Sequence, residues 1–379
     1  MSTLKTTNLQ HASAASPAIV LASDGSATAQ LSSLNGGALS GARNRIINGD
    51  MRIDQRNAGA SVTGNDSVFT VDRFKIEASQ SSKLTVQQNA GSITPPSGFS
   101  NYCGVTSSSA YSVSASDYFA IVQYIEGYNV SDLAFGSASA SAITLSFWVR
   151  SSLTGTFGGA LRNSGASRSR AFAYTINAAN IWEYKTVTIT GDTTGTWLTT
   201  NGVGLYVAFG LGVGSTFSGT AGVWAGANYL SVTGATSVVG TNGATFYITG
   251  VQLEAGSVAT PFERRSYGQE LALCQRYYQK SYDQATVPGT NTDTGVIVHL
   301  CGTNGTAAFY NTVQFGVLMR AAPSITVYDI AGNSGKVYRA ANNKTAATLY
   351  VSNKNATIGT DDATSALGIY YHYTASAEL

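Results

Sequence analysis

Residues 143–150, Ile143-Thr144-Leu145-Ser146-Phe147-Trp148-Val149-Arg150, decide the fold class of this chain. The odd-numbered positions are all apolar, whereas Thr144, Ser146 and Arg150 share the even-numbered face with Trp148. A period of two is typical of a β-strand with one face in a core and the other in contact with water or a partner. Trp148 is out of phase with the apolar face. Its ring is therefore a candidate for binding a ligand, for packing under a second sheet or for contacting another subunit.

Similar patterns recur on both sides of this stretch, separated by Gly, Ser and Asn. Residues 118–125 are apolar on both faces apart from Gln123, which suits a strand in the middle of a sandwich. Five further segments bring the count to at least seven strands: 69–77, 171–176, 182–190, 204–210 and 245–253. This number of strands, with almost no helix signal, predicts an all-β fold, with a large β-sandwich or jelly roll over residues 42–265.

The composition agrees with an all-β chain. Of 379 residues, 22 are basic and 20 are acidic, so 11% are charged, against about 25% in an average soluble domain. The net charge of +2 comes without basic runs, so we expect neither nucleic-acid binding nor attachment to an anionic membrane. The apolar run 203–213 is shorter than the roughly 20 residues that a membrane span needs, so we expect buried strand there and no membrane insertion.

Residues 1–41 are predicted to form a separate arm. Asp24-Gly25 fits a two-residue hairpin turn between the apolar segments 18–23 and 26–31. An isolated hairpin is only marginally stable in water, so the arm is expected to become ordered against a partner or another copy of the chain, with a floppy tail as the alternative.

A connecting helix is predicted within residues 266–281. Ser266 and Gln269 have the spacing of a capping box, and apolar residues at helical intervals would place one face of a helix over 267–280 against a neighbour: Tyr267, Leu271, Cys274 and Tyr278. Strand patterns resume after it, at 295–301, 307–319, 324–328, 337–340, 347–351 and 366–373. Residues 282–379 are therefore predicted to form a small C-terminal β-sandwich.

The sequence offers few groups for catalysis. Cys103, Cys274 and Cys301 are an odd number without metal-ligand spacing, so they are interpreted as small buried hydrophobic residues, and no metal site is predicted. Four acids in the first sandwich are candidates for a glycosidase pair, although the sequence does not say which of them lie close together: Asp117, Glu126, Asp132 and Glu183. We predict a protein without a catalytic set.

Aromatic residues are the better candidates for a binding site. The 21 tyrosines exceed what a sandwich core needs, and flat rings with a polar tip suit sugar rings. Near the C-terminus, Tyr371 and Tyr373 alternate with Tyr370 and His372, so one of the two pairs is expected to face away from the core. The glycan-binding candidates are Tyr371, Tyr373, Trp148, Tyr124 and Trp182.

Four motifs follow one another along the chain: Arg43-Asn44-Arg45-Ile46-Ile47-Asn48-Gly49-Asp50-Met51, Val71-Asp72-Arg73-Phe74, Gly250-Val251-Gln252-Leu253-Glu254-Ala255-Gly256 and residues 267–282 (YGQELALCQRYYQKSY). Together they resemble tail fibre and receptor-binding proteins of tailed bacteriophages. Leu9-Gln10-His11 and the hairpin of the arm look like the attachment end of such fibres.

Residues 146–150 and 182–189 are similar to strands of the jelly roll of carbohydrate-binding modules. Those modules often hold a structural calcium between their first strand, here near Asn48 and Asp50, and their last strand, here 246–253. Gly250 stands where an acid often stands in that pattern. No cofactor is therefore predicted, and calcium would depend on other oxygen ligands such as backbone carbonyls.

The resemblance implies a homotrimeric component of the virion, on the phage tail or another particle surface, made in the host cytoplasm. Its N-terminal arm would attach to the baseplate or another virion protein, and it would bind a bacterial surface polysaccharide without cleaving it. If the arm is anchored, the C-terminal domain is displayed farthest out, which favours Tyr371 and Tyr373 for the primary contact. Two alternatives stay open: a capsid-decorating or head-fibre protein, and a polysaccharide depolymerase.

Overall fold

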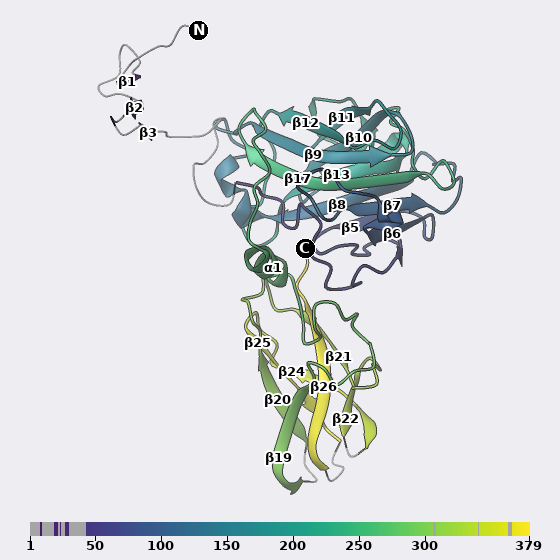
Figure 1. The fold of residues 1–379 in the computed structure, drawn as a ribbon, viewed down its shortest axis with the longest axis vertical. Helices are drawn as coiled ribbons and strands as arrows, with labels where there is room; N and C mark the ends of the chain where they lie inside the picture. Colours follow the sequence, from purple (N-terminus) through teal and green to yellow (C-terminus); the bar gives the residue numbers. More distant parts are fainter. Residues whose placement is uncertain are drawn as a thin grey trace.

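The computed structural model describes residues 43–305, 308–339, 341–362 and 366–379 and, near the N-terminus, residues 8–9, 19–21, 23 and 27–29. A large and a small β-sandwich lie end to end, and helix α1 (Tyr267–Gln275) lies between them (Figure 1). The predicted all-β class is confirmed, and α1 is the one α-helix of the described residues.

The large sandwich consists of two six-stranded sheets. Sheet I has the order β15 (Trp224–Ala225), β11 (Ser169–Ile176), β10 (Gly155–Arg162), β13 (Val203–Val213), β8 (Tyr118–Glu126) and β5 (Lys75–Ala78). Sheet II has the order β12 (Glu183–Ile189), β9 (Ile143–Ser151), β17 (Thr245–Ala255), β7 (Cys103–Ser107), β6 (Leu84–Gln88) and β4 (Val62–Thr63). Neighbouring strands in both sheets run antiparallel, while β14 (Ser218–Gly219) and β16 (Ser231–Val232) form a small parallel pair. The large sandwich also contains four short 3₁₀ helices: η1 (Ala90–Ser92), η2 (Gly127–Asn129), η3 (Ser131–Leu133) and η4 (Ser215–Phe217).

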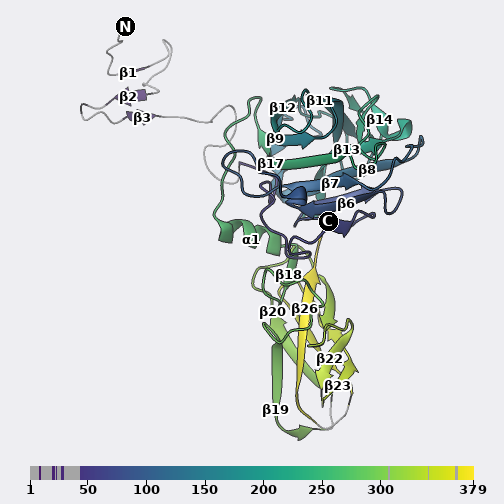
Figure 2. The same ribbon diagram turned by 45° about the vertical axis from the view of Figure 1, so that its right-hand side comes forward.

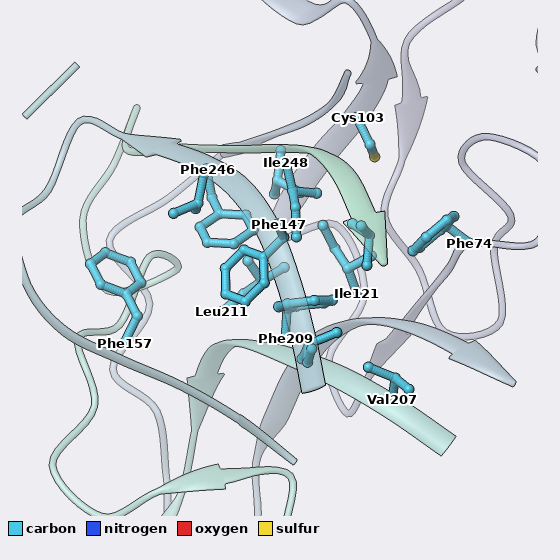
Figure 3. Packing of buried hydrophobic residues seen from close by; sticks show 14 of the residues in the cluster. Phe74, Cys103, Ile121, Phe147, Phe157, Val207, Phe209, Leu211, Phe246 and Ile248 are labelled. Carbon is cyan, nitrogen blue, oxygen red and sulfur yellow. The ribbon is translucent and has the colours of Figure 1, made fainter. Parts of the chain in front are cut away.

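The core of the large sandwich lies between the two sheets. The apolar face predicted for residues 143–150 is confirmed, because the side chains of its odd-numbered positions are fully buried. Phe147 of β9 meets Phe209 of β13 with ring centroids 5.0 Å apart, and Phe246 of β17 lies nearby (Figure 3). Cys103 is buried in the same core, as predicted, and burial raises the pKa of its thiol to about 12. Each large apolar side chain buried here stabilises the fold by about 1.5–3 kcal/mol.

Most predicted strands are present, but several were missed, among them β6, β7 and β10 of the large sandwich and β25 (Asn355–Thr360) of the small one. The segment of β10 contains three glycines, which are typical of loops. They are needed here because other chain segments come close. A Cβ on Gly158 would lie 2.4 Å from the Ser231 hydroxyl oxygen, and one on Gly159 would lie 2.2 Å from the Ala208 carbonyl oxygen.

The predicted strand over residues 69–77 is wrong in its first half. Val71-Asp72-Arg73-Phe74 forms a tight turn, in which the Phe74 N–H donates to the Val71 carbonyl at 3.1 Å and Arg73 has a φ of 72°. Strand β5 begins only after this turn. The turn directs Arg73 toward Tyr277 and Glu378, whereas the Asp72 carboxylate accepts hydrogen bonds from the Gln55 backbone and side chain.

The small sandwich is arranged around β26 (Ala366–Ser376), which pairs with four other strands. These are β18 (Tyr278–Lys280), β19 (Ile297–Gly305), β21 (Ser324–Tyr328) and β22 (Lys336–Arg339), and β23 (Asn342–Thr345) extends the sheet beyond β22. A second sheet has the order β20 (Phe309–Gln314), β25 (Asn355–Thr360) and β24 (Ala347–Leu349). Figure 2 shows β26 running along the length of this sandwich, with β18 next to α1.

Helix α1 begins as predicted and ends earlier than predicted. Ser266 and Gln269 form the capping box, with each side chain bonded to the other residue's backbone. The expected helix over 267–280 stops at Gln275, because β18 pairs with the end of β26 and takes residues 278–280 into a sheet. The predicted apolar face is also wrong in part: Tyr267 is 49% exposed, while Glu270 and Cys274 are the buried helical residues.

A charged cluster joins α1 to the large sandwich. The Arg276 guanidinium donates to both carboxylate oxygens of Glu126, at 2.9 Å and 2.6 Å, and the Tyr277 hydroxyl donates to the same carboxylate at 2.7 Å. Closer to the start of the helix, the Glu270 carboxylate accepts a hydrogen bond from the backbone N–H of Asn48 at 2.5 Å. These contacts come from strand β8 and from residues 43–51, far apart in the sequence.

A second cluster joins the two sandwiches directly. The Glu378 carboxylate pairs with Arg73 and, at 2.9 Å, with Arg56, close to the C-terminal end of the chain at this junction (Figure 1). Each guanidinium also lies over a tyrosine ring, Arg73 over Tyr277 at 3.5 Å and Arg56 over Tyr278 at 3.8 Å. Burial lowers the pKa of Arg73 to about 10. Three of the four motifs therefore build the junction between the sandwiches.

The predicted hairpin of the arm is present as strand pairing. β2 (Ile19–Leu21) pairs antiparallel with β3 (Ala27–Ala29) and also with β1 (Asn8–Leu9). The turn at Asp24-Gly25 lies outside the described residues, as does most of the segment 1–41. In the part of the chain that the structure describes, no helix has the length and apolar character of a membrane span.

Candidate functional site

Trp148 and Tyr184 form an aromatic pair on the outer face of sheet II. Residue 148 of β9 lies directly opposite Tyr184 of β12 in the strand register, and the two ring centroids are 5.4 Å apart. Tyr184 is 44% exposed and Trp148 is partly exposed. Among the described residues, neither the indole N–H nor the phenol hydroxyl has a hydrogen-bond partner. Both rings therefore retain polar groups that a bound molecule can use.

Gly250 makes room beside this pair. On the other side of β9, the register of β17 shifts between Thr249 and Gln252, which places a bulge next to Trp148. Gly250 has a φ of 62°, and a Cβ there would lie 2.7 Å from the Phe99 ring and 3.2 Å from the indole. Only glycine fits this position without displacing an aromatic ring.

Together these residues line an open pocket with a volume of about 480 Å³, here called the Trp148 pocket. Its lining residues are Phe99, Ser146, Trp148, Tyr184, Gly250, Ala259, Thr260, Pro261, Phe262 and Arg264. Phe99 and Phe262 pack edge to face at 5.2 Å, and the Arg264 guanidinium lies over both rings. Aromatic faces with a few polar groups at their edges are suited to stacking on a sugar ring and hydrogen-bonding its hydroxyls.

The wall of the pocket is fixed by the motif Gln252-Leu253-Glu254. The buried Glu254 carboxylate accepts hydrogen bonds from the Thr260 backbone N–H at 2.8 Å and from its hydroxyl at 2.6 Å. The Gln252 amide oxygen accepts from the Glu263 backbone N–H at 2.8 Å, and its amide nitrogen donates to the same Glu254 carboxylate. This motif thus holds residues 260–263 over the sheet, next to the aromatic rings.

The structure places Trp182 and Tyr124 away from this pocket. Trp182 lies on the same face of sheet II, but it packs against Tyr102 with ring centroids 5.6 Å apart and donates its indole N–H to the Thr94 carbonyl at 2.9 Å. Tyr124 belongs to sheet I, where its hydroxyl bonds to Glu77, and burial raises its pKa. Trp148, Trp182 and Tyr124 therefore lie at three separate positions on the large sandwich.

Tyr371 and Tyr373 do not form an exposed aromatic pair. They are 0% and 7% exposed, and the expectation that one of two alternating pairs faces away from the core is wrong, because His372 is also fully buried and Tyr370 is only partly exposed. The reason is the position of β26, which has paired strands on both sides and packed side chains on both faces. Burial raises the pKa of Tyr371 to about 12. Neither ring offers a face to a sugar.

The four candidate carboxylates are all bound to structural partners. Asp117 accepts from Ser79, Tyr111 and the Ser114 backbone, and Glu183 accepts from Lys185 and the Asn177 backbone. These hydrogen bonds lower both pKa values to about 2, even though desolvation opposes them. Glu126 binds Arg276, and Asp132 binds Arg45 at 2.5 Å. A general acid needs a raised pKa, so Asp117 and Glu183 are unsuited to that role.

The residues named for calcium do not fit it. Residues 43–61 contain no strand, contrary to the expected first strand near Asn48 and Asp50. The Asn48 amide oxygen accepts from the Ile53 N–H at 3.0 Å, and its nitrogen donates to the Ile53 and Asp72 carbonyls. Asp50 pairs with Arg52 at 3.1 Å. Within the described residues there is no group of three or more His, Cys, Asp or Glu that could hold a metal ion.

Trp148 is the one pocket residue that was predicted to bind a glycan, and the four others that bring an aromatic ring or a charge were missed: Phe99, Tyr184, Phe262 and Arg264. Tyr184 could have been found, because it shares a strand face with Thr186 and Thr188, opposite the face of the apolar Val187 and Ile189. The other three come from irregular segments, 91–102 and 256–266. Their approach to Trp148 depends on the bulge at Gly250, and no local pattern indicates it.

Neither a family of known proteins nor a curated protein matches this sequence. Similar solved structures include the enzymatically active domain of tailspike protein 4 from bacteriophage CBA120, at 12% identity and a TM-score of 0.32, where the match covers 57% of this chain and 22% of that chain. This chain therefore spans less than a quarter of the tailspike structure.

Two others are carbohydrate-binding modules. The family 11 module from Clostridium thermocellum, in complex with a β-1,3-1,4-mixed-linked tetrasaccharide, is 11% identical with a TM-score of 0.25, and 53% of this chain and 98% of that chain are covered. TmCBM61, in complex with β-1,4-galactotriose, is 11% identical with a TM-score of 0.25, and 51% and 91% are covered. These likenesses are weak, and the function proposed below rests on the Trp148 pocket.

Proposed function

We propose that this protein binds a bacterial surface glycan in the Trp148 pocket and does not cleave it. The observation that supports this proposal most directly is the pairing of Trp148 with Tyr184 beside the open bulge at Gly250. Two adjacent rings on a sheet surface, each with a free polar group, provide both the apolar face and the hydrogen bonds that a sugar ring requires.

The absence of carboxylates from the pocket supports binding without cleavage. A glycosidase acting by the usual mechanism needs two Asp or Glu side chains about 5–10 Å apart, flanking the scissile bond. None of the described residues lining the Trp148 pocket is acidic. We therefore expect the purified protein to release no reducing ends from a polysaccharide that it binds, and release of oligosaccharides would favour the depolymerase alternative.

The same proposal places the protein on a phage particle as a homotrimer. Its support is the resemblance of the four motifs to tail fibre and receptor-binding proteins. A trimer repeats a weak sugar site and gains avidity. Light scattering should give three times the chain mass of 39.3 kDa, and a monomer at micromolar concentration would contradict this assembly.

The experiment that tests glycan binding removes the two rings one at a time. Trp148→Ala and Tyr184→Ala are compared with the unaltered protein on an array of bacterial glycans and in adsorption to host cells. Loss of one stacking ring costs about 0.5–1.5 kcal/mol, which weakens each site about 2- to 12-fold. Simultaneous contacts in a trimer increase this effect on cells.

A matched control separates binding from general effects of removing an aromatic residue. Tyr128 is 60% exposed and lies outside the Trp148 pocket, so Tyr128→Ala should leave binding unchanged. Circular dichroism confirms the fold of each variant. If all three variants bind as the unaltered protein does, the Trp148 pocket is not the glycan site.

A further inference from the structure

Arg264 is the one charged residue among the described residues that line the Trp148 pocket. It is exposed, whereas the other pocket residues are aromatic, small or uncharged polar. The position of its guanidinium is defined by the two phenyl rings beneath it, with the guanidinium carbon 4.7 Å from the Phe99 centroid and 5.7 Å from that of Phe262. Such cation–π contacts orient the group and leave its N–H edges available for hydrogen bonds.

The backbone beside Arg264 preserves this arrangement. Gly98 has a φ of 84°, and a Cβ there would lie 2.9 Å from a terminal guanidinium nitrogen of Arg264. Glycine at this position satisfies the turn and also leaves space for the guanidinium. The loop that carries Phe99 therefore leaves the Arg264 guanidinium room beside Gly98.

Arg264 differs from the neighbouring arginines in having no carboxylate partner. Arg265 pairs with Glu263 at 3.1 Å and with Glu270 at 3.3 Å, and Arg52 pairs with Asp50 at 3.1 Å. Among the described residues, no Asp or Glu oxygen lies within 4 Å of an Arg264 nitrogen. Burial raises the pKa of Asp50, and the charge of Arg264 opposes this rise through space, but the ion pair of that carboxylate is with Arg52.

We propose that the Trp148 pocket selects a glycan that carries an anionic group, which Arg264 binds while Trp148 and Tyr184 stack on the sugar ring. This inference rests on the glycan-binding function proposed above and adds the class of sugar. A guanidinium presents two parallel N–H donors that match the two oxygens of a carboxylate or a phosphate. Because no described residue of the lining is acidic, nothing in that lining repels such a group.

The test compares an acidic oligosaccharide with its neutral counterpart. The probes are an oligogalacturonate and the same oligomer after reduction of its carboxyl groups, with a poly(glycerol phosphate) oligomer as the phosphate probe. Binding to the whole protein is measured by calorimetry at low and at physiological salt. We expect the unaltered protein to prefer an anionic probe about tenfold or more, and added salt to reduce that preference.

The variants Arg264→Gln and Arg264→Lys locate the preference. Arg264→Gln should remove it while leaving the affinity for the neutral probe unchanged, and Arg264→Lys should keep only part of it, because an ammonium is a point charge without the paired donors. Arg150→Gln is the matched control, since Arg150 lies on the same sheet face outside the pocket and donates to the Asn180 carbonyl.

The outcomes separate this inference from the proposed function. Equal binding of charged and neutral probes, with loss of both in Trp148→Ala, would overturn the anionic preference and keep the glycan site. A preference that survives Arg264→Gln would likewise overturn the role of Arg264. If the unaltered protein binds no probe and no glycan on the array, the proposed function fails, and this inference fails with it.

Discussion

Gly250 combines two properties that a side chain would disturb. Its positive φ permits the bulge in β17, and its missing Cβ lets the Phe99 ring and the Trp148 indole both come close to its backbone. The bulge and the pocket therefore depend on the same residue. The effect of a substitution there on stability and its effect on glycan binding can be measured separately.

Replacing Gly250 by Ala should reduce stability and also weaken glycan binding. Gly243 is the matched control, because it has a φ of 74° and no described atom lies within 4 Å of the place that a Cβ would take. Gly243→Ala should show only the backbone cost, of about 1 kcal/mol. Gly250→Ala should exceed it, since a ring must move. Urea denaturation and calorimetric titration measure the two effects, and equal losses in both variants would show that steric contact contributes nothing.

His372 gives the small sandwich a dependence on pH. The Nδ1 atom of its ring shares a hydrogen bond of 3.1 Å with the Ser281 hydroxyl. The Nε2 atom donates a hydrogen bond of 3.0 Å to the Thr292 carbonyl. Burial lowers the pKa of His372 below its usual value, although the bond to Thr292 and the charge of Asp293 oppose the shift. Below about pH 6.5 the unfolded chain binds the proton more readily than the folded chain.

The folded state should therefore lose stability as the pH falls below about 6.5. The loss should stop once the pH is below the lowered pKa of His372 in the folded protein. Thermal unfolding recorded between pH 7.5 and 5 measures this slope. His372→Gln keeps a donor for the Thr292 carbonyl and has no titrating ring, so its slope should be smaller. An unchanged slope would assign the pH dependence to other groups.

Residue patterns predicted which face of a strand carries a ring, but not whether another layer covers it. Trp148 and Tyr373 both lie on strands with alternating sequences, yet one lines a pocket and the other is buried. The difference arises from position in the sheet. β26 is surrounded by strands from 278 to 339, and sequence alternation contains no information on neighbours so distant along the chain.

At the scale of elements, local signals determined where α1 begins but not where it ends. The capping box is formed by residues three positions apart, so it could be recognised in the sequence. The end of the helix depends on β26, about one hundred residues later, which pairs with Tyr278–Lys280. Strand β9 was predicted because its own sequence alternates. Strand β10 was missed because its glycines are explained only by chain segments that are distant in the sequence.

Removing the cap should destabilise α1 by about 1 kcal/mol. Ser266→Ala deletes the hydroxyl that accepts the Gln269 backbone N–H at 3.4 Å. Ser266→Asp keeps an acceptor near the positive end of the helix and should retain most of the stability. Chemical denaturation of both variants checks the difference, and equal stability would mean that the cap is not limiting.

At the scale of the whole molecule, the junction between the sandwiches combines ion pairs and hydrogen bonds with an apolar cluster, in which Ile47 and Ile53 pack with Tyr277 and residues of α1. Glu126 alone accepts three hydrogen bonds from Arg276 and Tyr277. Its side chain is 1% exposed, so removal of its charge leaves a partly buried guanidinium without its counterion. Such a loss costs about 3–5 kcal/mol when the pair is buried.

Glu126→Gln should therefore uncouple the unfolding of the two sandwiches. We expect one calorimetric transition in the unaltered protein and two in this variant, because the junction no longer transmits the stability of one part to the other. Glu183→Gln removes a carboxylate of the same sandwich that is remote from the junction and should leave a single transition. Two transitions in the unaltered protein would show that the junction does not couple the parts.

The pairing of Glu378 with Arg56 and Arg73 has a consequence for biosynthesis. The two arginines precede Glu378 by 322 and 305 residues. A ribosome that adds about 5–20 residues per second needs roughly 15–60 s to cover that distance. During this interval both guanidinium groups lack the Glu378 carboxylate, and the emerging large sandwich presents ionic groups beside the apolar Ile47 and Ile53 at the face that the small sandwich later covers. The charged part of this docking face reduces the apolar surface that stays exposed until the late-translated partner segment is made.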